Sequence, residues 1–256
     1  MNRIAQAFDQ QGKKALIAFI TGGDPNIEMT KQLIIAMAHA GVDLIEIGIP
    51  FSDPAAEGPV IERANIRGLA SGTTVNHLFD MVKEVRKTVQ IPILLMTYAN
   101  LIFAYGKEKF MQNCQIAGID GLIVPDLPLE EMGEFKATCG EYGVQQISML
   151  APTSTGRIEK IVEQAEGFLY CVSSLGVTGM RSSLETTIGD LIEKVDGKLP
   201  CAIGFGVSTP EQAKAMAQLA DGVIIGSAIV ALIEAHGEAS VAPVTAFIQA
   251  VRKELD

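Results

Sequence analysis

The chain alternates short apolar segments with longer segments of helical periodicity, and this alternation repeats eight times along its length. The apolar segments are rich in Ile, Leu and Val, as expected of parallel strands buried on both faces. Eight βα units predict an α/β fold closed as a (β/α)8 barrel, the TIM barrel, and their even repetition disfavours a doubly wound sheet. The predicted strands are Ala15–Thr21, Asp43–Ile49, Pro92–Tyr98, Gly121–Pro125, Val144–Leu150, Phe168–Val172, Cys201–Phe205 and Asp221–Gly226.

Between these strands, apolar residues recur at the i, i+3, i+4 spacing of amphipathic helices. The segment before Gly12 predicts an extra N-terminal helix that closes the bottom of the barrel, and extra helices are expected in the βα loops, such as Pro59–Ala70. No low-complexity linker divides the chain, so we expect residues 1–256 to form one domain. The helices predicted between and after the strands are Met29–Ala40, Val75–Val89, Glu108–Ala117, Glu130–Tyr142, Arg157–Ala165, Leu184–Val195, Pro210–Leu219 and Val241–Leu255.

Composition excludes several classes of function. The net charge of −10 and the absence of a Lys/Arg cluster disfavour nucleic-acid binding. No apolar run approaches the roughly 18 residues of a membrane span, and the N-terminus lacks the apolar core of a signal peptide. The four cysteines have no paired spacing, which indicates reduced thiols in a cytoplasmic protein.

The reactive groups at the strand ends limit the chemistry, because active sites of this barrel lie at the C-terminal ends of its strands. All three histidines fall in helical segments, and no cluster has the spacing of metal ligands, so metal chemistry is disfavoured. No lysine lies within or at the end of a strand, which disfavours a Schiff base. Cys171 lies in a strand but has no histidine partner in the pattern, so a nucleophilic role for it is disfavoured.

Carboxylates remain, and Glu46 is the most unusual of them because it interrupts an otherwise apolar strand. Burial raises the pKa of a carboxyl toward neutrality and makes it a usable proton donor and acceptor. The alternative is that Glu46 is an ion-paired or hydrogen-bonded structural group. Glu57, in the polar loop after the same strand, is a candidate for a second carboxylate that stays ionised, and Asp53 is its rival.

Glycines after the last two predicted strands indicate a phosphate site. Gly206, Gly226 and Ser227 would offer backbone N–H groups at the place where such barrels often bind phosphate. The long Gly/Ser/Thr-rich segment Ser173–Ser183 suggests a lid over the substrate, and its Gly179 would also reach the phosphate.

The chain resembles the tryptophan synthase α subunit family over essentially its whole length. The matching stretches are Phe19–Pro25, Glu46–Pro54, Tyr98–Asn100, Pro125–Pro128, Gly176–Gly179, Gly204–Gly206 and Gly226–Ser227. The resemblance implies a (β/α)8 lyase that cleaves indole-3-glycerol phosphate by a retro-aldol reaction into indole and glyceraldehyde 3-phosphate, in L-tryptophan biosynthesis.

The resemblance also assigns site residues. It implies that Glu46 is the acid/base, that Glu57 stabilises the indolenine N–H, and that Tyr170 is an active-site tyrosine. Position 57 is usually Asp and position 62 often Gln in this family, whereas this chain has Glu57 and Glu62. We expect Glu57→Asp to retain or raise activity. The implied indole pocket and lid comprise Phe19, Met96, Tyr98, Ile123, Thr178 and Phe205, and the implied phosphate site comprises Gly179, Gly206, Gly226 and Ser227.

The family further implies a partner. Its α subunit works with a β subunit, typically as an αββα heterotetramer, and the β subunit carries pyridoxal phosphate, so no cofactor is expected in this chain. The loops around Asp53–Pro54 and Asn100–Phe103 are expected to meet that partner. Two other hypotheses remain open: a standalone indole-releasing lyase, and a regulatory subunit that binds ligand and partner but has lost its chemistry. A phosphosugar isomerase is disfavoured, since it would need a different motif at Glu46.

Overall fold

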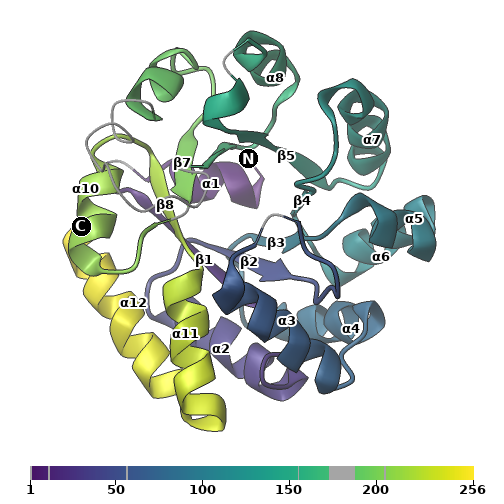
Figure 1. Ribbon diagram of the computed structural model, residues 1–256, viewed down its shortest axis with the longest axis vertical. Coiled ribbons are helices and arrows are strands. Elements are labelled where there is room, and N and C mark those ends of the chain that lie inside the picture. Colours follow the sequence, from purple (N-terminus) through teal and green to yellow (C-terminus); the bar gives the residue numbers. More distant parts are fainter. Residues whose placement is uncertain (1, 11, 56, 155, 173–187, 205) are drawn as a thin grey trace.

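The computed structural model describes residues 2–10, 12–55, 57–154, 156–172, 188–204 and 206–256. Within them, eight parallel strands close into a barrel, because each strand pairs with its neighbours in sequence and β8 pairs back with β1 (Figure 1). The predicted (β/α)8 fold is therefore confirmed. The strands are β1 (Ala15–Thr21), β2 (Leu44–Gly48), β3 (Ile93–Met96), β4 (Gly121–Ile123), β5 (Gln145–Leu150), β6 (Leu169–Val172), β7 (Cys201–Gly204) and β8 (Gly222–Ile225).

Helices surround the barrel as an outer ring (Figure 1). The extra helix predicted after the second strand is confirmed as α3, with the predicted bounds. The predicted helix 184–195 begins outside the described residues and is helical from 188 to 193. The helices that Figure 1 labels are α1 (Arg3–Phe8), α2 (Ile27–His39), α3 (Pro59–Ala70), α4 (Val75–Val85), α5 (Ala99–Tyr105), α6 (Lys107–Ala117), α7 (Leu129–Glu141), α8 (Ile158–Gln164), α10 (Pro210–Ala217), α11 (Ser227–His236) and α12 (Val241–Leu255).

Two of these helices, α5 and α11, were not predicted. Each starts within a few residues of a strand, and neither has a side-chain hydrogen bond at its N-cap. Without a Ser, Thr, Asn or Asp cap, the sequence gives no start signal that separates such a helix from the strand before it. The third strand is also shorter than predicted, because Tyr98 serves as the N-cap of α5.

The strands place alternate side chains on the two faces of the sheet. Side chains on the outer face pack beneath the helices, as Ile45 and Ile47 do. Side chains on the inner face fill the barrel in a separate apolar cluster. The strand residues of that inner cluster include Ile17, Phe19, Leu44, Leu94, Met96, Ile123, Ile147, Phe168, Tyr170, Ala202 and Ile224.

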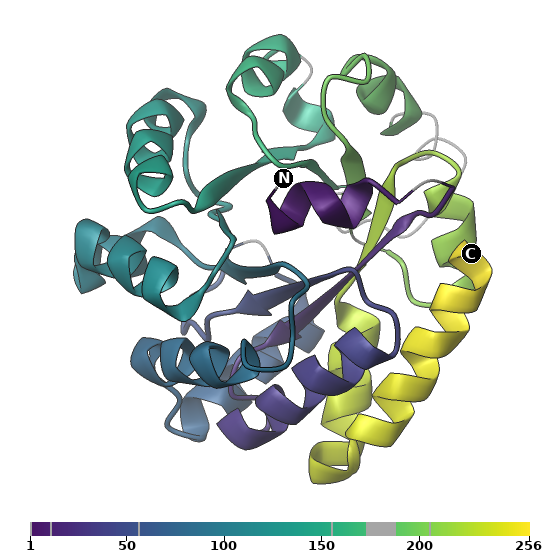
Figure 2. The same ribbon diagram turned by 180° about the vertical axis from the view of Figure 1, so that it is seen from behind.

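Helix α1 lies across the end of the barrel that Figure 2 faces. Its Ile4 is 1% exposed and belongs to the inner cluster, and the ring of Phe8 lies 5.2 Å from that of Phe168. The prediction that an N-terminal helix closes the barrel bottom is confirmed. Because α1 covers one end of the barrel, a functional site is expected at the opposite end. Among the described helices, none is long and apolar enough to cross a membrane.

Candidate active site

Glu46 lies on the inner face of β2, where it follows Leu44 at the two-residue spacing of a strand. Its neighbours across the sheet are Phe19 on β1 and Leu94 on β3. The side chain is fully buried, and neither carboxylate oxygen has a hydrogen-bond partner among the described residues. Burial raises the pKa of Glu46 from 4.5 to about 8. The alternative that Glu46 is an ion-paired structural group is wrong within the described residues.

Tyr170 occupies the inner face of β6 and is 5% exposed. Its ring fits there because position 204 on β7 is glycine: a Cβ at that position would lie 2.6 Å from the Tyr170 ring. Burial, and then the charge of Glu46, raise the pKa of Tyr170 well above its ordinary value. The hydroxyl is therefore neutral, and it lies within electrostatic range of Glu46.

Glu57 enters the site from the loop between β2 and α3 and is half-buried. Asn65 Nδ2 on α3 donates a hydrogen bond to Glu57 Oε2 at 3.2 Å. Burial raises the pKa of Glu57, whereas hydrogen bonds from Tyr98 and Asn65 oppose this rise and the nearby charge of Glu62 adds to it. Glu57 thus has a more polar environment than Glu46, as predicted for a second carboxylate.

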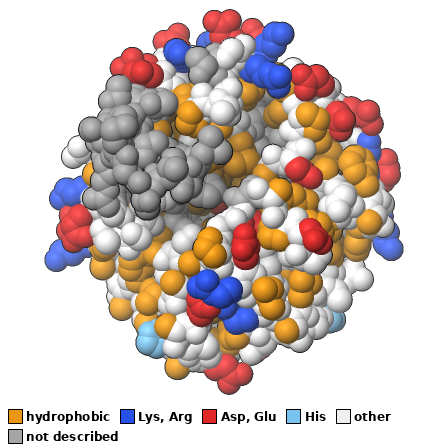
Figure 3. Space-filling model, in the orientation of Figure 1, with side chains coloured by type: hydrophobic (Ala, Val, Ile, Leu, Met, Phe, Trp, Pro, Cys, Tyr) orange, Lys and Arg blue, Asp and Glu red, His pale blue; other side chains and the backbone are white. Residues whose placement is uncertain are grey.

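A cavity of about 220 Å³ opens at the barrel end opposite α1, and Glu57 and Tyr170 line it. The fully buried Glu46 is not among its lining residues, although Phe19, its neighbour across the sheet, is. It lies where β1, β3, β6 and β8 end, and its wall is apolar except at a few positions. Its lining residues are Phe19, Glu57, Ile61, Met96, Tyr170, Gly206, Val207, Ser208, Ile224, Gly226 and Ser227. Around the middle of this face, hydrophobic and acidic side chains gather, and most Lys and Arg side chains lie toward the rim (Figure 3).

Three of the predicted phosphate residues meet at one side of this cavity. Gly226 is the N-cap of α11 and Ser227 its first residue, so the unpaired N–H groups of the first helical turn face an end with no capping side chain. Helix α10 differs, because the Thr209 side chain caps it. Gly206 has φ 78°, a left-handed conformation that glycine adopts without strain. An anion is favoured at such a helix N-terminus.

The other predicted residues divide into three groups. Ile123 is buried in the inner cluster beneath the cavity, and Tyr98 contacts Glu57 instead of lining the cavity. Asp53, the rival second carboxylate, is exposed, accepts a hydrogen bond from Ser52 and does not line the cavity. The remaining predictions, Thr178, Gly179, Phe205 and the lid Ser173–Ser183, lie outside the described residues.

Sequence reasoning missed Asn65, Val207, Ser208 and the inner residues Ile61 and Ile224. One signal existed for Asn65, which lies four residues after Ile61 on the buried side of α3 and is a polar residue on an apolar face. A hydrogen bond with Cys201, and then burial, raise the pKa of the Cys171 thiol far above its ordinary value. No group of His, Cys, Asp and Glu suited to a metal occurs in the described part.

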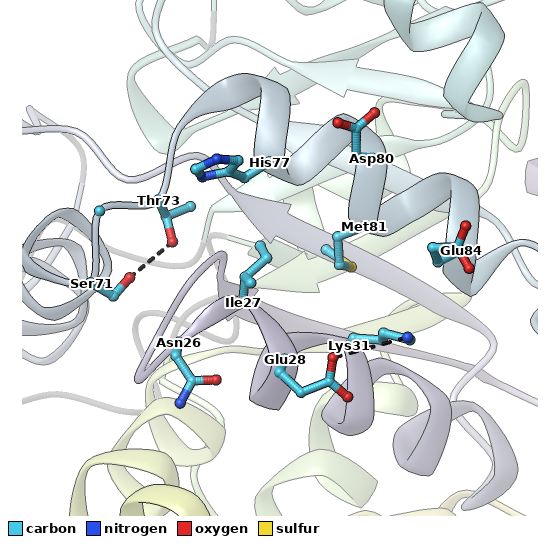
Figure 4. Close-up of a pocket in the computed structure, with 11 residues that line it drawn as sticks. Asn26, Ile27, Glu28, Lys31, Ser71, Thr73, His77, Asp80, Met81 and Glu84 are labelled. Carbon is cyan, nitrogen blue, oxygen red and sulfur yellow. Dashed lines mark hydrogen bonds and ion pairs between the residues drawn. The ribbon is translucent and has the colours of Figure 1, made fainter.

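A larger groove of about 430 Å³ lies outside the barrel, between α2 and α4 (Figure 4). Its acidic side chains, Glu28, Asp80 and Glu84, lie along the two helices together with Lys31, which is 4.0 Å from Glu28. No barrel strand contributes to it. Its three carboxylates are exposed whereas Glu46 is fully buried, so the smaller axial cavity is the better candidate for catalysis.

Comparison with known proteins shows the family to which the chain belongs. The family model for the tryptophan synthase alpha chain matches residues 5–255. The chain belongs to the tryptophan synthase alpha chain family. Proteins of that name from Lactiplantibacillus plantarum and Geobacter sulfurreducens are 47% and 44% identical to it; the first alignment covers 95% of this chain and 93% of the relative, the second 100% and 99%.

Solved structures of this family share the fold. The tryptophan synthase subunit alpha of Legionella pneumophila aligns with a TM-score of 0.91 and 36% identity, covering 100% of this chain and 99% of that one. A chain of the tryptophan synthase complex from Pyrococcus furiosus aligns with a TM-score of 0.84 and 32% identity, covering 93% and 98%. Family membership thus rests on sequence and on fold independently.

Proposed function

We propose that this chain cleaves indole-3-glycerol phosphate into indole and glyceraldehyde 3-phosphate, as the α subunit of tryptophan synthase. The observation that carries the proposal is Glu46, a buried carboxyl without a described hydrogen-bond partner and with a pKa of about 8. It lies beside Phe19 and within electrostatic range of Tyr170, and both of these line a cavity that the second carboxylate, Glu57, also lines. Near neutral pH such a group can donate a proton and accept one in the same turnover.

The reaction needs two proton transfers and no redox partner. Protonation of the ring carbon that carries the glycerol chain, by Glu46, gives an indolenine whose N–H is cationic. The Glu57 carboxylate stabilises that N–H. Glu46, now a carboxylate, takes the proton from the adjacent glycerol hydroxyl, which lets the C–C bond break. The electron pair of that bond returns to the ring, and the hydroxyl carbon becomes the aldehyde.

The remaining residues bind and orient the substrate. The indole ring fits the apolar wall of Phe19 and Met96, and the neutral Tyr170 hydroxyl is a hydrogen-bond donor beside Glu46. The phosphate binds at Gly206, Gly226 and Ser227, where helix N–H groups take the place of cationic side chains.

We also propose the family's assembly for this chain. It binds a tryptophan synthase β subunit as an αββα heterotetramer in the cytoplasm, the β subunit holds the pyridoxal phosphate, and this chain needs no cofactor of its own. The proton transfers above are consistent with this, since Glu46 donates and accepts the proton and Glu57 supplies the negative charge beside the N–H.

The test is to mix the purified chain with indole-3-glycerol phosphate and to follow indole release with and without a β subunit. Slow release that the partner accelerates is the expected result. Fast release by the chain alone would favour a standalone lyase. No release in either condition, with glycerol 3-phosphate still bound, would point to a regulatory subunit.

The Glu46 assignment has its own test. Glu46→Gln keeps the shape of the side chain but cannot exchange a proton, so turnover should fall by at least about a thousandfold, within the range of general acid–base contributions. Circular dichroism should show an unchanged fold. Turnover near that of the wild type would refute the assignment.

A further inference from the structure

The Glu57 carboxylate is held by two side chains that the catalytic steps do not use. Asn65 Nδ2 donates to its Oε2 at 3.2 Å, and the Tyr98 side chain also hydrogen-bonds to it. The Tyr98 oxygen at the same time accepts the backbone N–H of Ala55 at 2.9 Å. Because that oxygen accepts from Ala55 and the Glu57 carboxylate can only accept, Tyr98 is the donor in its hydrogen bond with Glu57.

Both donors are rigidly placed. Asn65 is 4% exposed and Tyr98 is 5% exposed, and the Tyr98 ring packs 5.0 Å from that of Phe51. Helix α3, which carries Asn65, is fixed by Arg67, which makes two hydrogen bonds of 2.8 Å to the buried Asp24. Because both donors are held in place, they favour a single position of the Glu57 carboxylate.

We propose that Asn65 and Tyr98 are positioning residues. They hold the carboxylate of residue 57 at the distance that a glutamate side chain reaches, so that aspartate cannot replace Glu57 in this chain without loss of activity. The proposal rests on the proposed function where it concerns turnover. It reverses the expectation from sequence that Glu57→Asp retains or raises activity.

The length of the side chain at position 57 determines whether its carboxylate can accept the hydrogen bond from Asn65. Removing one methylene withdraws the carboxylate by about 1 Å or more, since a C–C bond is about 1.5 Å long. The Asn65 contact, already 3.2 Å, would then exceed the range of a hydrogen bond. A carboxylate without this donor is poorly aimed at the substrate N–H and binds its proton more tightly, because the hydrogen bond that favoured the charged form is lost.

The test is a double-mutant cycle of Glu57→Asp and Asn65→Ala, read as kcat/KM for indole release. Each single substitution should lower kcat/KM by about tenfold, the worth of one hydrogen bond to a charged group. The double variant should be no worse than either, because both remove the same contact. In Asn65→Ala the acidic limb of the pH profile should move to higher pH, which a purely structural role would not cause.

Ile66→Ala is the matched control, since Ile66 is the neighbour of Asn65 on α3 but is 66% exposed. It should leave kcat/KM and the pH profile unchanged. If Asn65→Ala does not fold, Glu57→Asp tests the proposal by itself. That substitution lies in a loop, and it should still lower kcat/KM. Full activity of Glu57→Asp, or losses that multiply in the double variant, would overturn the proposal.

A second measurement separates this proposal from the proposed function. The carboxyl of Glu57 is followed by ¹³C NMR in glutamate-labelled protein, and its resonance is identified by its absence in Glu57→Gln. Asn65→Ala should raise the pKa of Glu57 whether or not the chain turns over substrate. An unchanged titration would overturn the positioning role, whereas an inactive wild type with the expected titration would count against the lyase activity alone.

Discussion

At the scale of the residue, Glu46 shows that the acid proposed to carry the chemistry also has a cost in stability, because it lies buried within an apolar strand. The strand pattern alone predicts its burial, because alternation places it on the same face as Leu44. In the folded chain its pKa is about 8, whereas in the unfolded chain it is near the ordinary value of 4.5. The folded state therefore keeps a proton that the unfolded state releases between these pH values.

This difference predicts how stability depends on pH. A group whose pKa is raised on folding lowers the free energy of unfolding as pH rises from about 4.5 to about 8, and the loss is complete above that range. We expect the free energy of unfolding of the wild type, measured in urea, to fall more steeply with pH than that of Glu46→Gln, by on the order of 1 kcal/mol per pH unit. Parallel curves for the two proteins would contradict the raised pKa.

A second prediction at this scale concerns Glu62 and its effect on the pKa of Glu57. Its charge is the last of the causes that act on Glu57, and it raises the pKa of that carboxyl. Glu62→Gln should therefore lower the pKa of Glu57 and move the acidic limb of the kcat/KM profile to lower pH, with a smaller shift at high salt. Glu141→Gln, an exposed change on α7, is the control that alters net charge equally. Equal shifts in both variants would show that net charge alone is responsible.

At the scale of the element, α3 links three parts of the molecule. Its Arg67 pairs with Asp24, in the loop after β1, and with Glu234 on α11, while Arg63 also pairs with Glu234. Since α11 begins at the proposed phosphate site and α3 carries Asn65, this network connects the phosphate end of the cavity with its carboxylate end.

Replacement of Arg67 and of Arg63 should have very different effects on the free energy of unfolding. The Asp24 side chain is fully buried, so Arg67→Ala leaves a buried charge unpaired and should destabilise the fold by about 3 kcal/mol. Arg63 is 51% exposed, and Arg63→Ala should cost much less than Arg67→Ala, because an exposed ion pair contributes little to stability. Urea unfolding of both variants measures the difference. Equal costs would mean that the network acts through exposed Glu234 pairs and not through Asp24.

Sequence patterns predicted the elements that have a local signal. They failed where tertiary contacts determine the structure. The strands and α3 follow from apolar runs and from Pro59 at the first helical position. Helix α11 has no capping signal, because the same Gly226 that leaves its N-terminus open for phosphate is what hides its start. Likewise Glu57 could be selected only by resemblance, since its contact with Asn65 depends on how α3 docks on the barrel.

At the scale of the whole molecule, closure of the barrel joins the first and the last strand of the sheet. Strands β1 and β8 pair from Ala15 with Gly222 to Ala18 with Ile225, so both ends of the sequence are needed to complete the sheet. We propose on this ground that residues 1–256 fold as one domain. Closure also separates the two ends of the barrel, with α1 at one and the candidate active site at the other.

That separation allows the proposed β-subunit face to be tested. Phe103 on α5, just after the C-terminal end of β3, is 55% exposed, whereas its neighbour Ile102 is buried and anchors the helix. Exposed aromatic side chains on rigid elements often carry much of the energy of an interface. Phe103→Asp should weaken binding of a β subunit by at least about tenfold and reduce its activation of indole release, measured by titration with the partner, while the rate without partner stays the same.

Ile116→Asp is the matched control for this prediction. Ile116 is 59% exposed, but it lies in the last turn of α6, where the chain returns to the opposite end of the barrel. Because it offers a similar apolar area far from the active-site face, its loss should leave partner binding intact. If Ile116→Asp weakens binding and Phe103→Asp does not, the β subunit docks at the closed end beside α1, and its activation of the active site would have to act through the barrel instead of through the loops that surround the cavity.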